Sequence, residues 1–142
     1  MNLEKMDKRE IACEIAFHYL GTFYKWGGDD PSGFDCSGLV IEILKSVGIL
    51  PRKGDWTATK LYWYFSNKMT TEPSMGCLVF WHDGRNNIIH VEFMMNSELS
   101  LGASGGGSKT KTIEDAIKQN AFIKIRPYKT RDNLFGFVDP FA

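Results

Sequence analysis

The sequence lacks several features that identify common protein classes. Lys and Arg number 17 and Asp and Glu also number 17, so no excess of positive charge favours nucleic acid or an anionic membrane as a partner. No apolar run approaches the roughly 18 residues of a membrane span. Residues 1–10 carry charges where a signal peptide needs an apolar stretch. We therefore expect a chain with no membrane span and no conventional signal peptide, which is cytoplasmic as synthesised.

Cysteine is also scarce. Cys13, Cys36 and Cys77 are the three cysteines of the chain, and no Cys-x-x-Cys pair is present. An odd number of widely separated cysteines argues against a disulfide scaffold and against a zinc ribbon. The His-Glu-x-x-His motif of many zinc enzymes is missing as well. We therefore predict reduced thiols, no metal and no other cofactor.

What the chain does contain is an ordinary apolar content in a periodic arrangement. Its 142 residues, 43% of them hydrophobic, predict one domain over 1–142 with a sizeable core. The spacing predicts helices over 8–20, 36–47 and 57–67, strands over 77–81, 88–95 and 99–103, a short helix opened by a capping box at 112–115, and a final strand over 121–126. Glycine-rich segments at 25–33 and 105–107 are expected to form loops without regular structure. Helices first and an antiparallel sheet second predict an α+β fold.

Cys36 lies at the start of the second predicted helix, directly after a glycine-rich loop. Asp35 is the expected N-cap of this helix. The positive end of the helix dipole and the outward N–H groups favour a thiolate over a thiol, which is the form that attacks carbonyl carbons. The alternative is that Cys36 is a small buried hydrophobic residue. Cys13, in an amphipathic helix, and Cys77, in an apolar strand, fit that alternative better.

A nucleophilic thiolate needs a base within hydrogen-bond reach, and the chain has three histidines. His18 lies in the first predicted helix, where a packed or surface role is expected. His82 adjoins a hairpin turn and is expected to be exposed. His90 lies inside an apolar strand, where an imidazole without a partner is costly. We therefore expect His90 to be the base, the alternative being a hydrogen-bonded core histidine.

Four segments follow one another in the order YKWGG at 24–28, FDCSGLV at 34–40, GCLVFW at 76–81 and HV at 90–91. Together they resemble the bacterial cell-wall cysteine peptidases of the NlpC superfamily, over residues 8–126. The resemblance implies a papain-like fold, in which helices carrying Cys36 pack on a small antiparallel sheet bearing His90. It also implies hydrolysis of amide bonds in peptidoglycan stem peptides, most often between γ-D-glutamate and a diamino acid.

The resemblance also implies roles for residues around Cys36. Tyr24 would line the active site and help stabilise the oxyanion. Asp35 and Ser37 would contact the amino end of the stem peptide, and Trp26 would bind substrate beside them. In this mechanism Cys36 attacks the carbonyl carbon, and His90 takes the thiol proton and later protonates the leaving amine.

This sequence departs from the family pattern where the third catalytic residue is expected. The family's HVG appears here with Glu92 in place of glycine, and its third polar residue falls on Gly102, just before Ala103. Cys77, where Asp is common, is a minor departure. Glu92 shares a strand face with His90, and Ser100 shares one with Gly102, so both are candidates for orienting the imidazole. A backbone carbonyl or a water molecule is an equally open alternative as the group that orients the imidazole.

Other functions are compatible with parts of the sequence. An acyltransferase would use the same cysteine and histidine, and a binding or structural module would keep the fold without the chemistry. Residues 102–110 nearly spell a phosphate-binding P-loop, but the lysine falls one residue late. Without a signal peptide, a phage or prophage enzyme would reach the wall through a virion, a holin-type pore or a partner protein.

Overall fold

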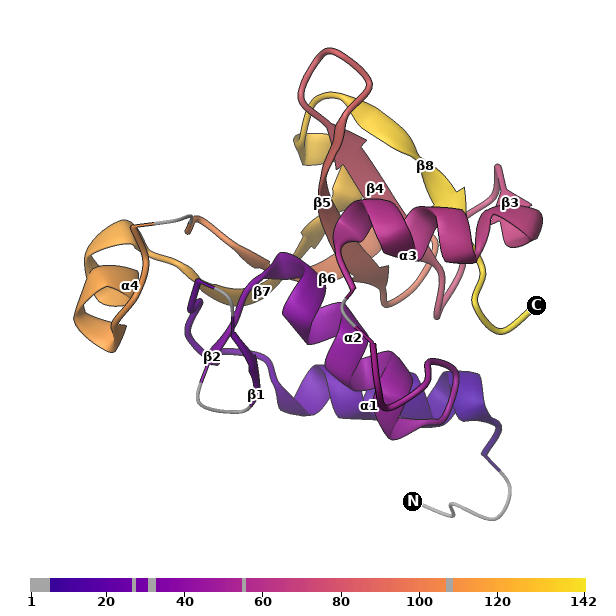
Figure 1. Cartoon of the computed structure of the whole chain (residues 1–142), viewed down its shortest axis with the longest axis horizontal. Helices are drawn as coiled ribbons and strands as arrows, with labels where there is room; N and C mark the ends of the chain where they lie inside the picture. The colour runs from indigo at the N-terminus through magenta and orange to yellow at the C-terminus, as the bar shows by residue number, and fades with distance from the viewer. Residues whose placement is uncertain (1–5, 27, 31–32, 55, 107–108) are drawn as a thin grey trace.

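The computed structural model in Figure 1 describes residues 6–26, 28–30, 33–54, 56–106 and 109–142. Residues 1–5 of the charged start, Gly27 of the first motif and Gly107 of the predicted flexible loop lie outside the described residues. The helices are α1 (Lys8–His18), α2 (Cys36–Ser46), α3 (Ala58–Tyr64) and α4 (Ile113–Gln119), with short 3-10 turns η2 (Ser66–Lys68) and η3 (Tyr128–Thr130). The predicted helices are confirmed, although the third ends earlier than expected and continues as η2.

The central sheet of the described chain has six strands in the order β3-β8-β4-β5-β6-β7, and every neighbouring pair is antiparallel. The strands are β3 (Met69–Thr70), β4 (Leu78–His82), β5 (Ile88–Met94), β6 (Leu99–Ser104), β7 (Phe122–Pro127) and β8 (Leu134–Val138). The predicted strands are confirmed, and with them the α+β fold.

The expectation that the strand at 121–126 is the last one is wrong. β8 follows it and lies inside the sheet, between β3 and β4. Gly136 interrupts this short apolar run, and glycine weakens a strand pattern because it has no side chain to pack. Pairing with β4 over Leu78–Trp81 is a long-range interaction, which local periodicity does not reveal.

The expectation that 25–33 contains no regular structure is also wrong. β1 (Asp29–Asp30) and β2 (Gly33–Phe34) pair as a small antiparallel ladder separate from the main sheet. Each of these strands is two residues long, which is too short for a periodic pattern to reveal, so the sequence shows only the loop-forming residues around them.

The helices hold the start of α2 in place by burying its apolar face. Figure 1 shows α1 and α2 together on one side of the sheet. Leu39, Val40, Ile43 and Leu44 of α2 are fully buried and lie in the same core as Val91 and Phe93 of β5. Burying each such side chain contributes about 1.5–3 kcal/mol, so α2 is firmly anchored against the strand that carries His90.

α4 lies apart from this arrangement and projects at one side of the molecule (Figure 1). The predicted capping box is confirmed: Thr112 accepts from the backbone N–H of Asp115, and the Asp115 carboxylate accepts from the backbone N–H of Thr112. Among the described residues, no helix is long and apolar enough to cross a membrane.

Candidate active site

Cys36 is the first residue of α2, and Asp35 is its N-cap, as predicted. The Asp35 Oδ1 atom accepts from the backbone N–H of Gly38 at 2.6 Å and from the hydroxyl of Ser37 at 3.4 Å. Within the described part of the chain, the backbone N–H groups of Cys36 and Ser37 have no acceptor. The start of the helix therefore presents two N–H donors beside the thiol, where they can stabilise negative charge.

Gly38 allows the loop that carries Tyr24 and Trp26 to approach α2 closely. A Cβ atom at Gly38 would lie 1.9 Å from the carbonyl oxygen of Gly28, a separation that no real contact allows. The same oxygen accepts from the backbone N–H of Asp35 at 3.0 Å. The glycine of the FDCSGLV segment thus has a packing function, since it lets the loop rest directly on the first turn of the helix.

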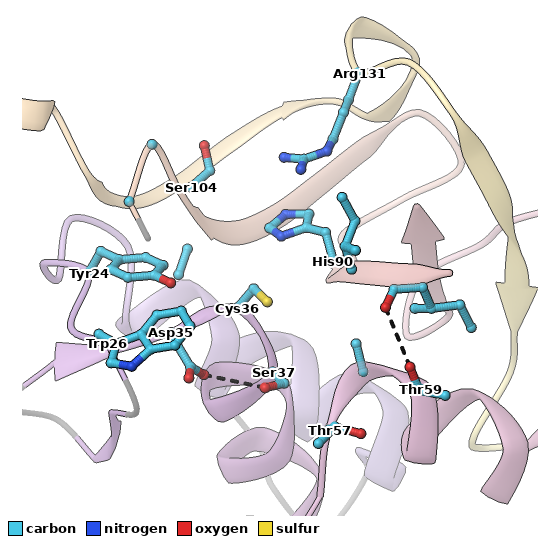
Figure 2. A pocket seen from close by; sticks show the side chains of 16 residues that line it. Tyr24, Trp26, Asp35, Cys36, Ser37, Thr57, Thr59, His90, Ser104 and Arg131 are labelled. Atoms are coloured by element: carbon cyan, nitrogen blue, oxygen red, sulfur yellow. Dashed lines mark hydrogen bonds between the residues drawn. The ribbon is translucent and has the colours of Figure 1, made fainter. Parts of the chain in front are cut away.

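The structure brings Cys36 and His90 together, as Figure 2 shows. His90 lies on β5 with 5% of its surface exposed, and its imidazole lines the same cavity as the Cys36 thiol. Burial alone lowers the pKa of His90, but its interactions with Cys36 and with the Glu92 carboxylate outweigh the effect of burial, so the net shift is upward. The protonated imidazole is therefore favoured. His18, which is exposed on α1, does not line this pocket, and neither does His82, which is half-buried at the end of β4 and not exposed as expected.

Glu92 contacts the other side of the imidazole. Its Oε2 atom lies 2.7 Å from His90 Nε2, and the Ser100 hydroxyl donates to its Oε1 atom at 2.7 Å. Burial raises the pKa of this carboxyl. The hydrogen bonds from His90 and Ser100, together with the positive charges of His90 and Arg126, lower the pKa by more than burial raises it. The net shift is downward, so Glu92 is a carboxylate although only 3% of its surface is exposed.

Gly102 makes room for Glu92. A Cβ atom at Gly102 would lie 2.2 Å from Glu92 Cγ and 2.5 Å from Cδ. The ladder between β5 and β6 covers only Phe93↔Leu101 and Met94↔Ser100, whereas β6 stays paired with β7 through Ser104. The two departures from the family pattern, a glutamate after His-Val and a glycine before Ala103, are therefore parts of one arrangement. The carboxylate occupies space that a side chain at 102 would need.

Tyr24 lies beside Cys36 with its ring nearly buried. Burial raises the pKa of its hydroxyl, and the negative charges of Cys36 and Asp35 raise it further, so the hydroxyl remains a hydrogen-bond donor. Gly106, from the P-loop-like segment, packs against this ring, and a Cβ atom there would lie 2.5 Å from it. Trp26, by contrast, is 53% exposed at the edge of the pocket.

These residues surround one cavity of about 360 Å³. Its lining includes every residue the sequence predicted for nucleophile, base and substrate contact, namely Tyr24, Trp26, Asp35, Cys36, Ser37 and His90. Glu92 and Ser100 lie behind the imidazole and do not line it. Arg131, from the segment after η3, also lines it and points into it (Figure 2). Sequence analysis missed this residue, because it belongs to none of the four motif segments.

The other two thiols lie outside the cavity. Burial and the charge of Glu14 raise the pKa of Cys13, and Cys77 is buried with its Sγ atom 3.6 Å from the Ser74 hydroxyl oxygen. Both fit the structural role that the sequence suggested for them. Among the described residues, no group of three or more His, Cys, Asp or Glu side chains gathers as metal ligands.

Comparison with solved structures identifies the fold. The NlpC/p60 domain of the peptidoglycan hydrolase SagA superposes with a TM-score of 0.66 at 23% identity, covering 94% of this chain and 99% of that one. An NlpC/P60 family protein from Bacillus cereus ATCC 10987 gives a TM-score of 0.69 at 22% identity, covering 94% of this chain and 40% of that one. The predicted papain-like α+β fold is thereby confirmed.

Sequence comparison extends the likeness to curated proteins. Probable peptidoglycan endopeptidase LytE of Bacillus subtilis is 31% identical over 109 residues, which cover 77% of this chain and 31% of LytE. Bifunctional muramidase/DL-endopeptidase CwlT of the same species is 40% identical over 125 residues, which cover 84% of this chain and 36% of CwlT. The chain spans about a third of the length of these relatives. Because the NlpC/P60 family model matches residues 21–127, most of its length, the chain belongs to the NlpC/P60 family.

Proposed function

We propose that this protein is a cysteine endopeptidase that hydrolyses amide bonds in peptidoglycan stem peptides, between γ-D-glutamate and a diamino acid. The observation that carries the proposal is that the thiol of Cys36, on the first turn of α2, and the buried imidazole of His90 lie in one cavity. The relatives LytE and CwlT, named as a probable peptidoglycan endopeptidase and as a DL-endopeptidase, support the choice of substrate.

In the proposed reaction the Cys36 thiolate attacks the amide carbonyl carbon. The backbone N–H of Cys36 and the hydroxyl of Tyr24 donate to the oxyanion that forms, both from fixed positions in a partly enclosed cavity. His90 gives its proton to the nitrogen of the leaving amine, and the C–N bond breaks. A water molecule, losing a proton to His90, then hydrolyses the thioester and releases the carboxylate.

Glu92 is the group that orients the imidazole in this proposal, and Ser100 supports Glu92. Since Nε2 of His90 is held by the Glu92 carboxylate, Nδ1 is left for the thiol. Ser100 contacts the carboxylate and not the ring. Of the alternatives that the sequence left open, a side chain on the histidine's own strand is the one with direct contact. A fixed carboxylate also stabilises the imidazolium that forms during the reaction.

Substrate would lie across the thiol, with its amino end toward Asp35 and Ser37. An ammonium group suits the carboxylate of Asp35, which can accept about four hydrogen bonds and therefore serves as helix cap and ligand together. The exposed ring of Trp26 borders the same end of the cavity. This orientation leaves the His90 side of the cavity for the amine fragment.

Mass spectrometry of muropeptides incubated with the wild type, Cys36→Ala and His90→Ala tests the proposal. We expect the wild type to release fragments with a new carboxyl and a new amino terminus. Both variants should lose turnover while keeping the circular dichroism spectrum of the wild type. Cys13→Ala is the matched control and should retain turnover. Wild-type activity in either of the first two variants would refute the mechanism.

Two further measurements separate the alternatives. Products in which an added amine or alcohol has replaced water would identify an acyltransferase. Iodoacetamide should label Cys36 faster than Cys13, because burial and Glu14 raise the pKa of the Cys13 thiol. Equal labelling rates would favour a module that keeps the fold without the chemistry.

A further inference from the structure

Arg131 is the one Lys or Arg among the described residues that line the cavity. It follows η3 and lies beyond residues 21–127, the part of the chain that matches the family model. Among the described residues, no carboxylate lies within salt-bridge distance of its guanidinium. A half-buried cation that points into a reaction cavity without an anionic partner is a candidate ligand for an anionic group of the substrate.

The position of Arg131 is fixed relative to His90 by the ring of Trp81. The guanidinium carbon lies 5.6 Å from the centroid of the Trp81 ring, and that ring lies 5.3 Å from the imidazole of His90. Trp81 is 1% exposed and pairs with His90 across β4 and β5 and with Leu134 across β4 and β8. The cation therefore rests on a rigid, buried surface next to the base.

The cavity consequently has opposite charges at its two ends. Asp35, with Tyr24 near it, lies on one side of Cys36, and Arg131 lies on the His90 side (Figure 2). His90 donates its proton to the leaving amine in the proposed mechanism, so the amine fragment lies on the His90 side. That fragment therefore faces the guanidinium.

We infer that Arg131 binds a carboxylate on the amine side of the scissile bond, and that it thereby selects substrates whose diamino acid carries a free carboxylate. The inference rests on the proposed function. Two sources supply this chemistry: the α-carboxylate of a C-terminal diamino acid, and the side-chain carboxylate of a diaminopimelic acid. A guanidinium suits either source because its planar N–H groups match both oxygens of a carboxylate.

Three substrates separate these sources. The first is γ-D-glutamyl-lysine with a free α-carboxylate, the second is its α-carboxamide, and the third is the α-carboxamide of γ-D-glutamyl-diaminopimelic acid. We expect the wild type to cleave the first with a kcat/KM about 10–100-fold above the second, the ratio expected for one charge-assisted contact. If the kcat/KM of the third substrate is close to that of the first, the side-chain carboxylate is sufficient for recognition. If it is close to that of the second, Arg131 binds the α-carboxylate.

Arg131→Gln should lower kcat/KM on the first substrate about 10–100-fold and affect the second far less, so that the preference for the first is lost. Lys129→Gln is the matched control. Lys129 lies two residues earlier, is exposed, and rests over the ring of Tyr128 at 6.0 Å, but it does not line the cavity. This control should keep the discrimination of the wild type.

Calorimetric titration of the Cys36→Ala variant makes the test independent of catalysis. We expect the first substrate to bind it about 10–100-fold more tightly than the second, and Arg131→Gln in that background to remove the difference. The third substrate is titrated in the same way: equal binding of all three substrates, or a preference that survives Arg131→Gln, would overturn the inference. Absence of turnover together with the expected binding preference would instead overturn the proposed hydrolysis and leave carboxylate recognition standing.

Discussion

Gly102→Ala tests whether space beside Glu92 is needed for catalysis. The added Cβ atom would lie 2.2 Å from Glu92 Cγ, and this separation must grow by about 1.2 Å to reach an ordinary contact of 3.4 Å. A similar shift of the carboxylate would stretch the 2.7 Å contact between Glu92 and His90 beyond hydrogen-bond distance. We expect kcat/KM to fall about 10²-fold, as in other enzymes that lose an orienting group.

Gly136→Ala is the matched control for this substitution. Gly136 lies on β8 of the same sheet, and a Cβ atom there would meet nothing within 4 Å. It should therefore leave turnover unchanged. Gly102→Ala should also lower the melting temperature by a few degrees, since crowding a packed site costs about 1–3 kcal/mol. Turnover is compared well below both melting temperatures, with circular dichroism as the check on folding.

A double-mutant cycle shows whether Gly102→Ala acts through Glu92. In the background of Glu92→Ala, which removes the crowded atoms, Gly102→Ala should have little further effect on turnover. If the two substitutions lower kcat/KM by independent factors, the alanine acts by another route. Wild-type turnover in folded Gly102→Ala and folded Glu92→Ala would refute the orienting role altogether.

Two other predictions concern the same site. Glu92→Gln should move the alkaline limb of the kcat/KM profile to lower pH, because the Glu92 carboxylate raises the pKa of His90 and its removal lets the imidazolium lose its proton at lower pH. An alkaline limb that stays in place would contradict this reason. Tyr24→Phe should lower kcat about 10–10³-fold with a smaller change in KM, because the Tyr24 hydroxyl donates to the oxyanion and not to the bound amide. A change confined to KM in steady-state kinetics would place Tyr24 in substrate binding instead.

Local signals explain why much of the site could be predicted. The apolar spacing predicted α2, whose Leu39, Val40, Ile43 and Leu44 are buried, and Asp35 identified its beginning. The alternation of side chains along a strand placed Glu92 on the same face as His90, and the hydrogen bond between them agrees. Each of these inferences depends on neighbours within about one turn or two strand positions.

Long-range pairing explains what could not be predicted. Whether Glu92 or Ser100 contacts the imidazole depends on where β5 and β6 stop pairing, which no local pattern specifies. Arg131 reaches the cavity because the chain returns along β4 as β8, and that pairing was missed. The route to the cell wall, through a virion, a pore or a partner protein, stays a prediction.

The interior place of β8 has a consequence for the order in which the protein assembles during synthesis. β8 follows the other strands of the described sheet in chain order, yet it covers one edge of β4, the strand that pairs with the His90 strand on its other side. Until residue 138 is available, a nascent chain holds Cys36 and His90 beside a strand edge with unpaired N–H and C=O groups. The ribosome adds about 5–20 residues per second, so this open state lasts for seconds in every molecule made. We therefore expect the fold to become stable only when β8 enters the sheet, and chaperone binding to nascent chains to be greatest in the interval just before.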